Sequence, residues 1–193
     1  SMPILQPPSQ ENRAINHINW LKENYPNVSS DEINLTDSFD KFESTLPEEI
    51  RDHLTMANVR ARPRMTTLYA YAGHHKMLVA GTGNKVEDFG VGFFTKYGDG
   101  GVDLSPIADL MKSEVRLCAA ELGVSQEILE AKPTDGLWDD DRSDEDQLGA
   151  TYSELEWAMK FDGNEQNVTK RELEVLHIYR RLNVANKHKM VPI

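Results

Sequence analysis

The chain has 193 residues and a formal net charge of −11, from 32 acidic and 21 basic side chains. This length fits a single domain with a substantial core, and the acidic balance argues against a nucleic-acid-binding surface. A lone cysteine excludes an internal disulfide framework, and no apolar run approaches the roughly 20 residues of a membrane span. We therefore expect a cytoplasmic protein without a nucleic-acid or membrane partner.

The first half of the chain predicts alternating helices and strands. Ala14, Ile18 and Leu21 share one face of an amphipathic helix, and residues 31–35 follow as a weak strand candidate. Pro47 suits the first turn of a second helix. Pro63 interrupts that helical pattern and biases the residue before it toward an extended conformation, so another helix is expected to begin there.

An apolar run at residues 77–80 is typical of a buried strand that ends at Gly81. In open α/β sheets, ligands bind beyond the carboxyl ends of the strands, which places a site at Thr82 and the residues after it. Residues 81–112 are rich in glycines, hydroxyls, carboxylates and lysines. Glycine allows close approach of the backbone to a ligand, and lysines match phosphate charge, so this composition predicts an anionic nucleotide as the ligand.

The second half of the chain predicts helices. An apolar stripe that ends at Gly123 would place Cys118 in the core. Two Thr-x-x-Glu patterns, beginning at Thr151 and Thr169, are typical of capping boxes. The acid-rich run at residues 139–146 is expected to be a charged loop, and residues 132–147 are expected to form a lid that becomes ordered over nucleotide.

Several strings resemble motifs of the ammonia-dependent NAD synthetases, and they occur in the order of that family. The main string has Gly-Thr-Gly-Asn-Lys at residues 81–85, followed by Phe-Phe-Thr-Lys-Tyr-Gly-Asp-Gly-Gly at residues 93–101. Further matches lie at residues 2–6, 58–62, 109–112, 133–138 and 187–189. The resemblance implies a single domain over residues 1–193, in the α/β class. Its fold would be a Rossmann-like parallel sheet flanked by helices, of the adenine-nucleotide alpha-hydrolase type.

The resemblance implies ATP-dependent amidation of deamido-NAD to NAD by ammonia, through an acyl adenylate. Mg²⁺ would assist, and Glu87 would be its ligand. The residues implied to contact ATP are Thr82, Lys112 and Thr134. Those implied to contact deamido-NAD are Arg62, Lys96, Asp103, His188 and Lys189. No catalytic residue is assigned. The family is homodimeric, which implies an apolar helical interface near residues 47–75.

The chain departs from the family in two places. The family's Ser-Gly-Gly-x-Asp-Ser phosphate-binding loop, with the strand before it, has no counterpart in the sequence. We therefore expect a fragment, incomplete at the N-terminus and also at the C-terminus, that is inactive alone. In addition, the segment from Glu87 to Lys96 holds one residue more than the commonest family spacing, which affects the local geometry of Glu87.

Two other classes of function stay open at this stage. One is another ATP-pyrophosphatase-superfamily ligase, such as a GMP synthetase or a tRNA-thiolating enzyme, although these lack the string at residues 94–101. The other is a catalytically inactive nucleotide-binding or interaction fragment. Intact mass of the purified protein would discriminate between a fragment and a longer chain.

Overall fold

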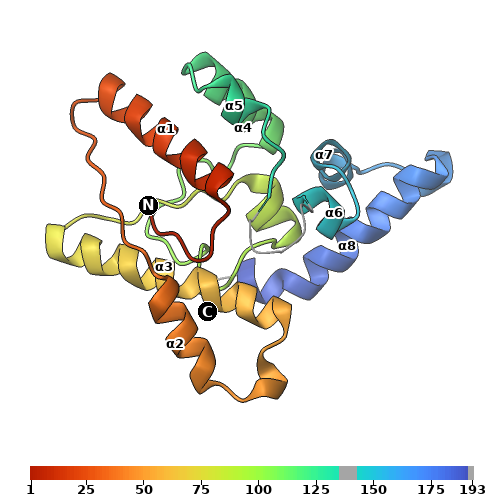
Figure 1. Ribbon diagram of the computed structural model, residues 1–193. Helices are drawn as coiled ribbons and strands as arrows, with labels where there is room; N and C mark the ends of the chain where they lie inside the picture. The colour runs from red at the N-terminus through yellow and green to blue at the C-terminus, as the bar shows by residue number, and fades with distance from the viewer. Residues whose placement is uncertain (135–142, 191–193) are drawn as a thin grey trace.

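The computed structural model describes residues 1–134 and 143–190, which form mainly helices joined by extended loops (Figure 1). Within these two ranges, no helix is both long and apolar enough to cross a lipid bilayer. The α-helices are α1 Pro8–Asn24, α2 Thr36–Thr45, α3 His53–His75, α4 Lys112–Glu121, α5 Gln126–Leu129, α6 Asp144–Leu148, α7 Tyr152–Lys160 and α8 Lys170–Met190. Three short helices of other types are η1 Glu48–Ile50, η2 Lys85–Val91 and η3 Glu165–Asn167.

Regular β-pairing in the described residues is limited to one isolated parallel bridge, between Ala80 and Leu104. The predicted strand at residues 77–80 is therefore only partly formed. It is not buried throughout, because Met77 and Leu78 are 67% and 65% exposed, whereas Val79 is buried. The reason is that the segment pairs with the chain near Leu104 at its carboxyl end alone.

The weak strand candidate at residues 31–35 lies beside the N-terminus. Ile33 N donates to Ser1 O at 2.9 Å, and Leu35 N donates to Pro3 O at 3.0 Å. These alternating hydrogen bonds resemble a strand ladder, but residues 31–35 do not form a strand. The predicted parallel sheet is therefore not confirmed in the described residues, where the Ala80–Leu104 bridge is the single β-pairing.

Helix α3 runs without interruption through Pro63, so the prediction of two helices that meet at this proline is wrong. Pro47 precedes the short turn η1 rather than an α-helix, and α3 begins after Asp52, whose carboxylate accepts a hydrogen bond from Thr55 N at 3.0 Å. Proline removes one helical donor, but contacts on both sides hold the helix together. Buried Met56 lies before Pro63, and beyond it Arg64 Nε donates to the backbone of the N-terminal segment.

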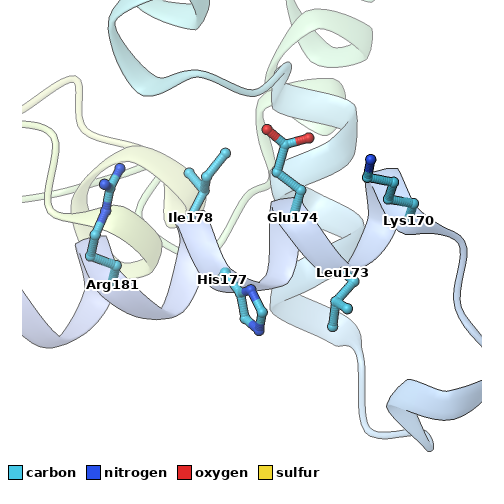
Figure 2. A pocket seen from close by; sticks show the side chains of 6 residues that line it. All are labelled: Lys170, Leu173, Glu174, His177, Ile178 and Arg181. Atoms are coloured by element: carbon cyan, nitrogen blue, oxygen red, sulfur yellow. The ribbon is translucent and has the colours of Figure 1, made fainter.

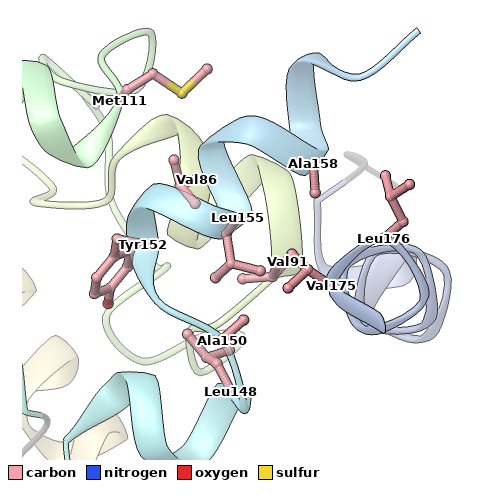
Figure 3. Close-up of a cluster of buried hydrophobic side chains, with 10 residues drawn as sticks. All are labelled: Val86, Val91, Met111, Leu148, Ala150, Tyr152, Leu155, Ala158, Val175 and Leu176. Carbon is pink, nitrogen blue, oxygen red and sulfur yellow. The ribbon is translucent and has the colours of Figure 1, made fainter. Parts of the chain in front are cut away.

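Two clusters of buried apolar side chains hold the fold together. The smaller one joins the N-terminal segment to α2 and α3 through Ile4, Leu35, Phe39 and Met56. The larger one fixes η2 against α6, α7 and α8 (Figure 3). A fully buried side chain of this kind contributes about 1.5–3 kcal/mol. The larger cluster contains Val86, Val91, Met111, Leu148, Ala150, Tyr152, Leu155, Ala158, Val175 and Leu176.

Local signals at the helix ends are confirmed. Thr151 and Glu154 form a capping box at the start of α7, and Thr169 and Glu172 exchange the same pair of hydrogen bonds before α8. Gly123 follows α4 with a φ of +77°, as a helix-ending glycine should. The prediction that Cys118 lies in the core is wrong, because α4 contributes no buried residue and this thiol is exposed.

Candidate functional site

The predicted nucleotide segment begins with a π-helix, η2, that runs from Lys85 to Val91. Asn84 caps it, because its Oδ1 accepts hydrogen bonds from Val86 N and Glu87 N at 3.0 and 3.1 Å. A π-helix takes up more residues per turn than an α-helix and often occurs at functional sites. The segment from Glu87 to Lys96, which is one residue longer than the commonest family spacing, begins within this π-helix.

Glu87 is the meeting point of three elements. Lys112 Nζ at the start of α4 lies 2.7 Å from Glu87 Oε1, and the Tyr152 hydroxyl on α7 donates to the same oxygen at 2.5 Å. The Asn84 side-chain amide donates to the other oxygen, Oε2. The predicted metal ligand and a predicted ATP contact therefore form an ion pair.

Tyr152 joins Glu87 to a second carboxylate. Its hydroxyl lies 3.2 Å from Asp144 Oδ2, and the Lys112 ammonium lies 4.9 Å from the centre of its ring. Burial, followed by the charges of Glu87 and Asp144, raises the pKa of the Tyr152 hydroxyl above its ordinary value. The hydroxyl consequently stays protonated and acts as a donor. Neither the Tyr152 hydroxyl nor the Asn84 amide was predicted from the sequence to contact Glu87.

Asp88, next to Glu87, lies against the glycine-rich loop. A Cβ atom at position 83 would overlap the Asp88 carboxylate, which explains the glycine there. Burial, the charges of Asp99 and Glu87, and only partial compensation by lysines raise the pKa of Asp88 to about 7. Asp88 is therefore a carboxyl group that titrates near neutral pH.

Beyond η2, the turn at residues 93–101 contacts the end of α8. Lys96 Nζ donates to His188 O at 2.9 Å, and Lys189 Nζ donates to Phe94 O at 2.7 Å. Burial lowers the pKa of Lys189, although nearby carboxylates oppose this shift. Three of the residues predicted to bind deamido-NAD, Lys96, His188 and Lys189, are thus brought together.

The other two predicted deamido-NAD contacts flank this turn on different elements. Arg62 is exposed on α3, one helical turn after Asn58, which accepts a hydrogen bond from Thr95 Oγ1 at 2.8 Å. Asp103 accepts a hydrogen bond from Val79 N at 2.8 Å. In this structure Asp103 therefore anchors the chain near the parallel bridge.

Of the three predicted ATP contacts, Lys112 and Thr134 line one cavity of about 370 Å³ between α1, α4 and α5. Arg13, Arg116 and Lys132 also line it, which gives the cavity a basic wall. Thr82 is exposed in the loop after the parallel bridge and is not among the lining residues. Residues 135–142 of the predicted lid lie outside the described residues.

A second cavity, of about 330 Å³, lies along α8 and contains none of the predicted site residues (Figure 2). Figure 2 shows that its side chains all come from one stretch of this helix. They are Lys170, Leu173, Glu174, His177, Ile178 and Arg181.

The described residues contain no group of three or more His, Cys, Asp or Glu side chains placed to hold a metal ion. Glu87 and Asp144 are nevertheless close to each other, because both carboxylates lie within hydrogen-bonding distance of the Tyr152 hydroxyl. One or two carboxylates combined with substrate phosphates are the usual ligands of Mg²⁺, which rarely occupies an all-protein cage. The donor set thus fits Mg²⁺ only together with a phosphate-bearing ligand.

Solved structures define the class of fold. The NMN synthetase from Francisella tularensis matches all of this chain and 75% of its own, with a TM-score of 0.86 and 29% identity. The NH3-dependent NAD synthetase from Campylobacter jejuni matches the same shares of the two chains, with a TM-score of 0.70 and 24% identity. The fold is therefore that of the NAD synthetases and their structural relatives.

The sequence comparisons identify the family. The family model described as NAD synthase matches residues 2–191, and the chain belongs to this family. The NH(3)-dependent NAD(+) synthetase of Mesoplasma florum is 44% identical over 129 residues, which are 67% of this chain and 51% of that protein. The protein of the same name from Carboxydothermus hydrogenoformans is 36% identical over 193 residues, 97% of this chain and 73% of its own. The chain thus spans about half the length of the Mesoplasma relative.

Proposed function

We propose that the protein carrying this chain is an ammonia-dependent NAD synthetase. The nicotinate carboxylate of deamido-NAD would attack the α-phosphorus of ATP, with release of pyrophosphate, and ammonia would then displace AMP from the acyl adenylate. The observation that carries the proposal is the ion pair of Glu87 and Lys112 beside η2, with Lys96 and Lys189 gathered just beyond the same helix.

The ATP side of the site would be built on Lys112 and Glu87. Lys112 lines the basic cavity, where its ammonium would make a charge-assisted contact to a phosphate oxygen. Glu87 and Asp144 would hold Mg²⁺ against the phosphates. When bound, this ion neutralises charge on the phosphoryl oxygens. Thr82 and Thr134 would add hydroxyl donors from the two loops that follow the bridge and α5.

The dinucleotide side would be built on the turn at residues 93–101. Lys96 and Lys189 hold backbone carbonyls in this structure, and both ammonium groups would exchange these partners for anionic oxygens of the ligand. Arg62 on α3 would approach from the opposite side. Positioning and electrostatic stabilisation would supply the rate, because charge develops on phosphoryl oxygens and no covalent nucleophile is needed.

The protein would act as a homodimer. Helix α3 exposes several large apolar side chains, with Leu54 60% exposed and Leu68, Tyr69 and Tyr71 between 36% and 42% exposed. Clusters of exposed apolar groups mark interaction surfaces. A second copy of the chain would cover this face and bring its own Arg62 close to the dinucleotide.

A second candidate is the same amidation on the mononucleotide, which yields NMN. The specific observation in its favour is the match to the Francisella NMN synthetase, with a TM-score of 0.86 against 0.70 for the Campylobacter NAD synthetase. Both reactions convert a nicotinate carboxylate into an amide. The ATP side of the site would therefore serve either substrate.

Product analysis tests the proposal. The full-length protein is incubated with ATP, Mg²⁺ and ammonium, and with either deamido-NAD or nicotinate mononucleotide. Faster formation of NAD and pyrophosphate from deamido-NAD supports the first candidate, whereas a preference for the mononucleotide supports the second. Absence of an amide product from both substrates would contradict the proposed function.

A further inference from the structure

The Glu87 carboxylate has two fixed donors and one mobile donor. Asn84 is 1% exposed and is locked by its own hydrogen bonds to the first turn of η2. Tyr152 is 3% exposed, and its ring lies at the edge of the larger apolar cluster (Figure 3). Lys112, in contrast, reaches Glu87 with a flexible four-carbon side chain that remains 22% exposed. Only the lysine can leave without disturbing the core.

Tyr152 itself is held rigidly. Its backbone N donates to Glu145 Oε1 at 2.8 Å, and the capping box formed by Thr151 and Glu154 fixes the start of α7 immediately before it. A hydroxyl on a fixed helix end can orient a carboxylate more precisely than a long side chain on the surface can, because little rotamer freedom remains.

We propose that Tyr152 is a positioning residue that keeps the Glu87 carboxylate oriented for a divalent cation when the Lys112 ammonium leaves it for a nucleotide phosphate. This inference rests on the ATP side of the proposed function. In the free protein the ammonium occupies the same oxygen as the hydroxyl, Glu87 Oε1, and so neutralises the carboxylate. In the bound protein the cation replaces the ammonium, while the hydroxyl and the Asn84 amide remain in place.

The exchange keeps charge in balance. Lys112 transfers its positive charge from a carboxylate to a phosphate, and the cation supplies positive charge to both anions. The centre of the Tyr152 ring lies 4.9 Å from the ammonium, a distance at which an aromatic ring attracts a cation. The hydroxyl thus serves the bound state, and it is more than a structural hydrogen bond of the free protein.

The test measures cation affinity in the full-length protein, with Mn²⁺ as the probe. Free Mn²⁺ is quantified by electron paramagnetic resonance in the presence of a non-hydrolysable ATP analogue, without deamido-NAD or ammonium. Tyr152→Phe keeps the ring and removes the hydroxyl, and it should weaken Mn²⁺ binding by at least about tenfold, as loss of a group that orients a metal ligand commonly does. An affinity within twofold of the wild type would overturn the proposal.

Tyr179→Phe is the matched control. Tyr179 packs against the same apolar cluster, and its hydroxyl has no hydrogen-bond partner within the described part of the chain. This variant should bind Mn²⁺ as the wild type does. A purely structural role for the Tyr152 hydroxyl would lower the melting temperature of Tyr152→Phe and leave its Mn²⁺ affinity equal to that of the control, which would contradict the inference.

A second measurement does not depend on the folding of Tyr152→Phe. 3-Fluorotyrosine at position 152 keeps the hydroxyl and reports on its surroundings by ¹⁹F NMR. Saturation with Mg²⁺ and the analogue should shift this resonance, because the ammonium leaves and a cation arrives; an unchanged resonance would contradict the inference.

If the wild type binds Mn²⁺ with nucleotide but forms no amide, the proposed reaction fails while this inference stands. Absence of Mn²⁺ binding would overturn the inference.

Discussion

Lys112 Nζ lies 2.7 Å from Glu87 Oε1, so the ammonium expected to bind phosphate is paired with the carboxylate expected to bind metal. Both side chains are largely shielded from solvent, at 22% and 14% exposure. In the free protein the Lys112 ammonium and the Glu87 carboxylate therefore neutralise each other's charge. On the proposed function, binding of substrate would separate the two side chains.

Lys112→Ala in the full-length protein should reduce turnover by at least about tenfold, because a hydrogen bond to a charged group contributes about 1.5–3 kcal/mol. Pyrophosphate release at saturating ammonium measures the effect. Lys160→Ala, which removes an exposed lysine at the end of α7, serves as the control and should leave turnover unchanged. Equal rates for the two variants would contradict the assignment of Lys112.

Asp88 should make stability depend on pH. Its pKa is raised in the folded protein to about 7 from its ordinary value of 3.8, so the folded state binds the proton more tightly than the unfolded state. The resulting stabilisation is complete below the unfolded pKa and is lost as pH rises through about 7. Urea unfolding at pH 5 and pH 8 should therefore show a smaller decline for Asp88→Asn than for the wild type. If the free energy of unfolding fell equally in the two proteins between pH 5 and pH 8, Asp88 would not be the cause of the pH dependence.

Gly92→Ala should destabilise the fold. Gly92 closes η2 with a φ of +66°, and an added Cβ would overlap the Asn186 side chain on α8. We expect a loss greater than about 1 kcal/mol in the free energy of unfolding. Gly73→Ala is the matched control, since a Cβ there meets nothing within 4 Å inside α3 and should stabilise by about 0.5–1 kcal/mol. The two substitutions should change the unfolding midpoint in opposite directions.

Leu54→Asp should weaken the proposed dimer. Leu54 is 60% exposed near the start of α3, and a charge there would be desolvated in an apolar interface. Sedimentation velocity at micromolar concentration should show a dimer for the wild type and a monomer for the variant. Leu117→Asp places the same charge on an exposed leucine of α4 and should remain dimeric. A monomeric wild type would refute the dimer.

Local sequence signals predicted the helix ends. The continuity of α3 and the exposure of Cys118 depend on long-range packing, which the sequence alone does not reveal. The capping boxes at Thr151 and Thr169 formed because each depends only on residues three apart. Helix α3 crosses Pro63 because packing on both sides outweighs the missing donor. The stripe that carries Cys118 has helical spacing, but α4 contributes no buried residue and Cys118 is exposed.

The sequence named candidate site residues but not their arrangement. Resemblance to a family pointed to Glu87, Lys96 and Lys112 individually, and their binding roles stay predictions. The structure adds that Glu87 and Lys112 are in contact. Tyr152 was missed because it lies 65 residues from Glu87 in the sequence and carries no local motif. The sequence shows that the segment from Glu87 to Lys96 is one residue longer than is usual in the family. Such a difference in length does not by itself predict a π-helix.

Incorporation of labelled nitrogen tests the central claim most directly. The full-length protein is supplied with ¹⁵N-ammonium, ATP, Mg²⁺ and deamido-NAD, and the products are analysed by mass spectrometry. The account predicts NAD that carries ¹⁵N in its nicotinamide group, with one AMP and one pyrophosphate formed per amide. Formation of ADP and phosphate, or consumption of ATP without a labelled amide on either the dinucleotide or the mononucleotide, would contradict it.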